Sequence, residues 1–315
     1  MSSGKSETLA FVFPGQGSQA VGMLGELAAD FPVVRETFDE ASGVLGYDLW
    51  QLVQEGPEAR LNETDKTQPA MLAAGVAVWK CWNGEGGTTP AVMAGHSLGE
   101  YTALVCAGVL DYAAAVRAVS ERGRFMQEAV PPGEGAMAAI LGLADDVVKG
   151  ICGEAARGSV VAAVNFNSPG QVVIAGAAAA VERAVDLAKE AGAKRAITLP
   201  VSVPSHCALM KPAAERMRAL LEGIEFRPPG IPVINNTDVA VCETPDAIRQ
   251  ALVRQLYHPV RWVETIQAMQ ARGVNTLVEC GPGKVLAGLT RRIDRSLAAF
   301  PVFDPATLEK ALKDT

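Results

Sequence analysis

Short apolar runs alternate with longer amphipathic segments in the first 130 residues and again after residue 200. The apolar runs end at Pro, Gly or polar residues, as strands buried on both faces usually do. We predict strands over residues 8–13, 91–94, 232–235 and 276–280, and helices over 21–54, 67–82, 97–107, 111–130, 208–222, 247–257, 263–272 and 285–293. This alternation predicts a mainly parallel α/β sheet with helices on both faces.

The segment between the Pro-Pro-Gly break at residues 131–133 and Pro200 has a different order. Its pattern predicts strands over 135–142, 160–166, 171–175 and 195–199, with helices over 144–156 and 177–191. The order β-α-β-β-α-β is the ferredoxin-like, or split βαβ, arrangement. We therefore expect one α/β domain built from residues 1–132 and 200–315, and an inserted ferredoxin-like subdomain over 133–199.

The composition excludes several classes of protein. Hydrophobic residues make up 49% of the 315 residues and charged residues 20%, which suffices for a packed core and excludes wholesale disorder. Lys and Arg number 28 against 35 Asp and Glu, so the chain lacks the positive charge that nucleic-acid binding needs. No apolar run is long enough for a signal peptide core or a membrane span. We expect a cytoplasmic protein without a membrane or nucleic-acid partner.

The cysteines are scattered, with no closely spaced pair of the kind that binds structural zinc. They are Cys81, Cys106, Cys152, Cys207, Cys242 and Cys280. Disulfide scaffolds belong mainly to short secreted chains, so we expect six reduced thiols and no metal site.

The sharpest local motif is GHSLG at residues 95–99, which matches G-x-S-x-G between a predicted strand and a predicted helix. The glycines permit a sharp turn that presents the serine to a cleft, and N–H groups at the helix start can stabilise an oxyanion. We interpret Ser97 as a nucleophile rather than part of a merely structural turn. Glu100 follows in the first helical turn, where the helix dipole favours a carboxylate, and we expect it to be structural.

A serine hydroxyl needs a base, and the sequence contains three histidines. His96 is adjacent to Ser97, so a tight turn directs its side chain elsewhere. His258 follows a helix end, where capping is its ordinary role. His206 lies in a loop, where catalytic partners in α/β sheets usually stand. The residues alone put His206 only modestly ahead, and the other two histidines stay open as alternatives.

Arg122 lies on the apolar face of the helix predicted over 111–130, in line with Ala115, Val119 and Met126. A buried arginine requires an anionic partner. That partner is either an internal Asp or Glu, which the residues alone favour, or the carboxylate of a substrate.

Six motifs resemble the signature of the malonyl-CoA:acyl carrier protein transacylases. They are FPGQGSQ at 13–19, GHSLGEY at 95–101, RGRFM at 122–126, NFNSP at 165–169, VPSH at 203–206 and ECGPG at 279–283. The resemblance extends from about residue 8 to residue 303, with the motifs in the expected order. The same architecture serves as the acyltransferase domain of polyketide and multidomain fatty acid synthases.

The resemblance implies an α/β-hydrolase-like core carrying a ferredoxin-like insert. It implies that Ser97 is the acylated nucleophile and His206 its general base, and that Arg122 binds the free malonyl carboxylate. The backbone N–H groups of Gln16 and Leu98 would form the oxyanion hole.

Two further positions gain a role from the resemblance. Gln255 matches the residue whose main chain orients the histidine in place of a triad acid. Met126 either lines the acyl pocket or, as is usual for a Met at helical spacing, packs in the core. His258 stands where the family often has Asn or Ser, and we expect no change in the chemistry.

The resemblance also implies ping-pong transfer from malonyl-CoA to acyl carrier protein, without metal or cofactor. We expect a monomer, although the sequence itself leaves the oligomeric state open. A free-standing chain favours fatty acid over polyketide synthesis. The basic pairs at residues 194–195 and 291–292 are candidates for docking the acidic carrier. A serine esterase or thioesterase is one alternative, against which a buried Arg122 argues. A non-catalytic carrier-binding subunit is another, against which the intact Ser97 and His206 argue.

Overall fold

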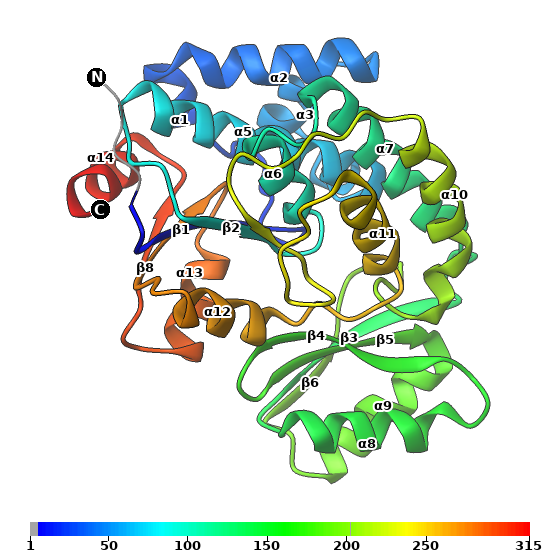
Figure 1. The fold of residues 1–315 in the computed structure, drawn as a ribbon. Coiled ribbons are helices and arrows are strands. Elements are labelled where there is room, and N and C mark those ends of the chain that lie inside the picture. The colour runs from blue at the N-terminus through cyan, green and yellow to red at the C-terminus, as the bar shows by residue number, and fades with distance from the viewer. Residues whose placement is uncertain (1–5, 202) are drawn as a thin grey trace.

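The computed structural model describes residues 6–201 and 203–315, and it contains two sheets (Figure 1). The larger sheet has the strand order β7-β2-β1-β8-β9, and all its neighbouring strands are parallel. Its strands are β1 (Leu9–Phe13), β2 (Val92–Gly95), β7 (Val233–Ile234), β8 (Thr276–Cys280) and β9 (Ala298–Val302). The mainly parallel α/β sheet expected from the sequence is confirmed.

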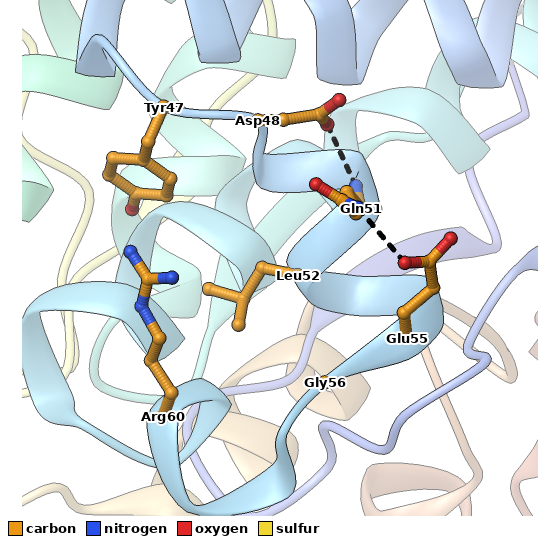
Figure 2. A pocket seen from close by; sticks show the side chains of 7 residues that line it. All are labelled: Tyr47, Asp48, Gln51, Leu52, Glu55, Gly56 and Arg60. Atoms are coloured by element: carbon orange, nitrogen blue, oxygen red, sulfur yellow. Dashed lines mark hydrogen bonds between the residues drawn. The ribbon is translucent and has the colours of Figure 1, made fainter.

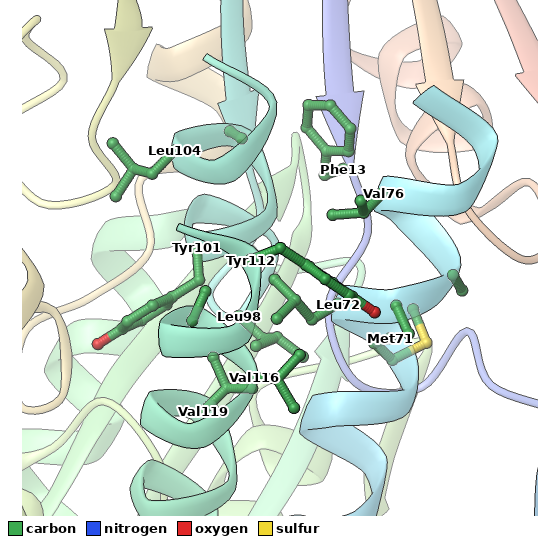
Figure 3. Packing of buried hydrophobic residues seen from close by; sticks show 14 of the residues in the cluster. Phe13, Met71, Leu72, Val76, Leu98, Tyr101, Leu104, Tyr112, Val116 and Val119 are labelled. Carbon is green, nitrogen blue, oxygen red and sulfur yellow. The ribbon is translucent and has the colours of Figure 1, made fainter. Parts of the chain in front are cut away.

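Helices cover both faces of this sheet. In β1, Leu9, Phe11 and Phe13 belong to one buried cluster, whereas Ala10 and Val12 belong to another, because successive side chains of a strand point to opposite faces. The first face packs against α5 (Thr64–Gly84), α6 (Gly99–Cys106) and α7 (Tyr112–Glu128), as Figure 3 shows in part. The second packs against α12 (Trp262–Ala271) and α13 (Val285–Ile293).

The remaining helices lie around this core. They are α1 (Gly25–Asp30), α2 (Pro32–Leu45), α3 (Leu49–Glu55), α4 (Glu58–Leu61), the 3-10 turn η1 (Ala208–Met210), α10 (Lys211–Glu222), α11 (Pro245–Gln255) and α14 (Pro305–Asp314). The helical region predicted over 21–54 is therefore three helices. Pro32 begins the second of them and Gly46, with a φ of 75°, ends it.

The second sheet is antiparallel, with the order β4-β5-β3-β6. Its elements run β3 (Gly135–Leu141), α8 (Asp145–Ala156), β4 (Val161–Ser168), β5 (Gln171–Ala177), α9 (Ala178–Glu190) and β6 (Arg195–Thr198). The predicted β-α-β-β-α-β order is confirmed, and α8 and α9 pack on one face of the sheet (Figure 1). Two backbone hydrogen bonds join β4 to the larger part: the Val260 N–H donates to Val164 O, and the Phe166 N–H donates to Val260 O.

Strand β9 and helix α14 were not predicted from the sequence. The missed signal was Asp304-Pro305 with Thr307, because Asp304 and Thr307 form a capping box and Pro305 occupies the first helical position. None of the helices in the described ranges combines the length and the apolar character needed to cross a membrane.

Candidate active site

Ser97 stands at the sharp turn between β2 and α6. Its φ of 52° is positive, a strained conformation for a residue other than glycine. The flanking glycines make the turn sterically feasible. A Cβ on Gly95 would lie 1.8 Å from the carbonyl carbon of Gly99, and a Cβ on Gly99 would lie 2.0 Å from Phe13 O. The serine side chain is half-buried at the carboxyl ends of the strands, where α/β sheets usually bind ligands.

His206 lies beside Ser97, although 109 positions separate them in the chain. Its Nε2 is 2.7 Å from Ser97 Oγ, and its Nδ1 is 2.7 Å from the backbone oxygen of Gln255. Because a carbonyl only accepts, Nδ1 carries the proton and Nε2 presents its lone pair to the serine. Burial and the nearby Arg122 charge lower the pKa of His206 to about 3, so the ring is neutral at neutral pH.

The other two histidines do not contact the serine hydroxyl. His96 Nε2 lies 2.8 Å from Asn167 Oδ1, and burial lowers the pKa of this ring. His258 is exposed and its ring lies against Tyr257. Of the three candidates, the structure therefore brings His206 to Ser97.

Arg122 is fully buried, yet among residues 6–201 and 203–315 no carboxylate forms an ion pair with it. Its Nη1 donates to Gln68 Oε1 at 2.8 Å and its Nη2 to Gln255 Oε1 at 3.0 Å. Nη2 also lies 3.3 Å from Ser97 Oγ, and Nε is buried without a partner. The internal ion pair that the residues alone favoured is thus not formed, and two neutral amides hold the cation without neutralising it.

A buried polar network holds the turn from behind. Asn236 Oδ1 accepts from the Ser97 N–H at 2.7 Å, and its Nδ2 donates to Gly95 O at 2.6 Å. Gln255 Nε2 donates to Ser97 O at 3.0 Å and to Glu100 Oε2 at 2.8 Å. Burial raises the pKa of Glu100 to about 7 against the opposing effect of its hydrogen bonds.

The loop after β1 passes close to the serine turn, since a Cβ on Gly15 would lie 2.6 Å from His96 O. Among the described residues, no hydrogen-bond partner faces the backbone N–H of either Gln16 or Leu98. Leu98 immediately precedes α6, where the helix dipole favours negative charge. Met126 is buried one turn beyond Arg122, and Gln68 Nε2 donates to its sulfur at 3.5 Å.

Two residues of this site were missed in the sequence. Gln68 is a fully buried amide that follows the polar residues 64–67 at the start of α5, and Asn236 follows β7 at the carboxyl edge of the sheet. The available signals were a polar residue that adjoins the apolar stretch of a helix and a polar residue at a strand end. Both signals are weak without the neighbours that only the fold supplies.

A separate cavity of about 390 Å³ lies among α3, α4 and the segment that precedes them, away from Ser97 (Figure 2). Most of its polar groups are already engaged, although the Tyr47 hydroxyl is buried without a hydrogen-bond partner. Asp48 accepts from the Gln51 N–H, Gln51 donates to Glu55, and Arg60 lies over the ring of Tyr47. No group of three or more His, Cys, Asp or Glu in the described part of the chain is arranged to hold a metal ion.

Comparison with known proteins identifies one family. The sequence model described as "Acyl transferase domain" matches residues 10–302. The chain is 62% identical over 305 residues to the malonyl CoA-acyl carrier protein transacylase of Escherichia coli, covering 96% of this chain and 98% of that protein. It is 47% identical over 306 residues to the protein of the same name from Bacillus subtilis, with 97% and 96% covered.

Solved structures agree with this assignment. A malonyl-transacylase in complex with its type II PKS acyl-carrier protein superposes with a TM-score of 0.97 at 60% identity, covering 98% of this chain and all of that one. An acyl carrier protein S-malonyltransferase from Vibrio cholerae gives a TM-score of 0.94 at 60% identity, with 96% and 99% covered.

Proposed function

Because this chain belongs to the acyl transferase domain family, we propose that it moves a malonyl group from malonyl-CoA to acyl carrier protein in fatty acid biosynthesis. The relatives named above support the donor and the acceptor. The single observation that carries the proposal is the position of Ser97 Oγ, 2.7 Å from a neutral imidazole and 3.3 Å from a buried cation without an anionic partner.

In the first half-reaction, Ser97 Oγ attacks the thioester carbonyl while its proton moves to His206 Nε2. The tetrahedral oxyanion is stabilised by the N–H groups of Gln16 and Leu98. The C–S bond then breaks, and the departing CoA sulfur takes the proton from the imidazolium. The Gln255 carbonyl keeps the ring in the required tautomer, in the role that a triad carboxylate has elsewhere.

The second half-reaction reverses these steps with another thiol. The phosphopantetheine thiol of acyl carrier protein gives its proton to His206 and attacks the malonyl-serine ester. The C–O bond to Ser97 breaks, and the serine oxygen recovers a proton from His206. The two thioesters are close in energy, so a nucleophile, a base and anion stabilisation suffice for the exchange.

Arg122 accounts for the choice of a malonyl group. A free carboxylate matches the fork of a guanidinium, and the pair forms in a buried site where it is weakly screened. Gln68 and Gln255 hold the guanidinium beside Ser97 and leave its charge for the substrate. Met126 then forms part of the wall behind the acyl group.

We also propose the finer description of the fold and the setting. The division into an α/β-hydrolase-like domain over 1–132 and 200–315 and a ferredoxin-like insert over 133–199 is supported by the two sheets. A monomer acting in the cytoplasm is consistent with six free, buried or half-buried cysteines. The exposed pair Lys194 and Arg195, at the start of the edge strand β6, suits an acidic carrier protein.

Turnover of malonyl-CoA with and without acyl carrier protein tests the proposal. We expect release of CoA in multiple turnovers only when the carrier is present, and neither release nor malonyl-carrier formation with Ser97→Ala. Continued release of CoA without the carrier, at an undiminished rate, would identify a thioesterase instead. Malonyl-carrier formation by the Ser97→Ala variant would move the nucleophile elsewhere.

A further inference from the structure

Glu100 is a buried carboxyl group in the polar network behind the Ser97 turn. It is 2% exposed, and in the described part of the chain no cation forms an ion pair with it. Its Oε2 accepts from the Asn236 N–H at 3.0 Å and from Gln255 Nε2 at 2.8 Å. Burying a carboxyl group without an ion pair is costly, and here burial raises the pKa of Glu100 although the nearby Arg122 charge acts to lower it. Its contact with Gln255 suggests what the carboxyl group does.

The side-chain amide of Gln255 has two ends, and only one orientation fits its surroundings. The nitrogen end faces two acceptors, Ser97 O and Glu100 Oε2, and the oxygen end faces a donor, Arg122 Nη2. A half-turn of the amide would set oxygen against two acceptors and N–H against the guanidinium. All three hydrogen bonds would be lost in a buried site, where unsatisfied polar groups are most costly.

We propose that Glu100 is a positioning residue that sets acyl-group preference through Gln255. By accepting from Gln255 Nε2, it keeps the amide oxygen on Arg122 and so holds the guanidinium where a substrate carboxylate meets it. The inference rests on the proposed function, because it concerns the preference for malonyl over acetyl groups. Since the role needs an acceptor and not a charge, a neutral amide at position 100 serves nearly as well.

The test compares loading of Ser97 from malonyl-CoA and from acetyl-CoA, as kcat/KM for each donor, in three variants. Glu100→Met removes the acceptor at similar volume, and Glu100→Gln keeps an acceptor without the charge. Glu279→Met is the matched control, because Glu279 is 1% exposed and likewise accepts two N–H bonds, from Leu286 and Ala287, but makes no contact with Gln255 or Arg122.

We expect Glu100→Met to lower the malonyl-to-acetyl ratio about tenfold, with the acetyl rate changed much less. Glu100→Gln keeps the ratio within about threefold of the wild type, because its oxygen replaces Oε2. Glu279→Met loses thermal stability but keeps the wild-type ratio. The inference would be overturned if Glu100→Met lowered kcat/KM equally for both donors, so that its ratio stayed at the wild-type value like that of the control. It would also be overturned if Glu100→Gln lowered the ratio as much as Glu100→Met does.

The double variant Glu100→Met/Gln255→Met tests whether Glu100 acts through Gln255, because it removes both partners of the hydrogen bond between them. If Glu100 acts through Gln255, the double variant has the same ratio as Gln255→Met alone. Additive losses would show that the two residues act independently. Failure of the proposed function is seen separately, since wild-type protein would then not load malonyl groups at all.

Discussion

Replacing Arg122 by Ala removes the cation that the account assigns to the substrate carboxylate. The guanidinium is fully buried, and within residues 6–201 and 203–315 only neutral acceptors hold it. A malonyl carboxylate that enters the Arg122→Ala site is therefore desolvated without a partner. Truncating one member of a buried, hydrogen-bonded charge pair costs about 2–5 kcal/mol. An acetyl group has no carboxylate and does not experience this cost.

The malonyl-to-acetyl ratio of kcat/KM should therefore fall by about 30- to 5,000-fold in Arg122→Ala. Arg122→Lys keeps the charge but cannot reach Gln68, Gln255 and a carboxylate with one nitrogen, so we expect an intermediate loss. Arg117→Ala, an exposed arginine on the same helix, is the control and should leave the ratio unchanged.

The assay measures the initial rate of Ser97 loading from each donor by intact-mass spectrometry. The thermal unfolding midpoint of each variant is measured alongside it. A general loss of packing would slow Ser97 loading from both donors together and would leave the malonyl-to-acetyl ratio unchanged. If the ratio in Arg122→Ala equals that of the wild type while the variant remains folded, the assignment of Arg122 to the substrate carboxylate is wrong.

Three further predictions concern the same structure. Because the pKa of His206 is lowered to about 3, the rate of Ser97 loading should change less than about twofold between about pH 7.5 and 5.5, as measured by quenched flow. With an imidazole of ordinary pKa, the loading rate would fall about tenfold over the same range, and such a fall would contradict the assignment. Burial raises the pKa of Glu279 from 4.5 to about 7, so the folded state binds more protons than the unfolded state between these values. Stability contributed by Glu279 should thus be lost as pH rises through this window. In denaturant unfolding, the unfolding free energy of the wild type relative to Glu279→Gln should fall by about 3 kcal/mol as pH rises from below 4.5 to above 7. An unchanged difference would contradict the burial argument. Gly95→Ala should destabilise the fold by about 3 kcal/mol or more and abolish loading, because the added Cβ would overlap Gly99; a variant with normal melting and loading would disprove the steric argument.

Much of the fold could be predicted because its signals are local. The short apolar strands and the β-α-β-β-α-β order after residue 133 follow from hydrophobic period and from Pro and Gly breaks. Strand β9 was missed because Pro301 within it argues against a strand. It lies at the edge of the sheet, and its pairing with β8 makes it a strand, whereas its own sequence has no clear alternation of apolar and polar residues.

From the residues alone, only the part of the site that lies within one short segment of the chain could be predicted. The turn at Ser97 depends on glycines two positions to either side, which are visible in the sequence. The pairing of Ser97 with His206 depends on loops that are far apart in the chain, and only the family resemblance favoured this histidine clearly. The position of Arg122 on an apolar helix face indicated burial, but its neutral partners Gln68 and Gln255 come from two other helices. Periodicity along one helix carries no information about them.

The most direct test of the central claim is peptide mapping by mass spectrometry after a brief incubation of the protein with malonyl-CoA alone. We expect one malonyl group, carried as an ester on Ser97. On addition of acyl carrier protein, that group should leave the serine and appear on the phosphopantetheine thiol. Malonyl groups on another residue, or an ester that decays at the same rate whether or not the carrier is added, would contradict the account.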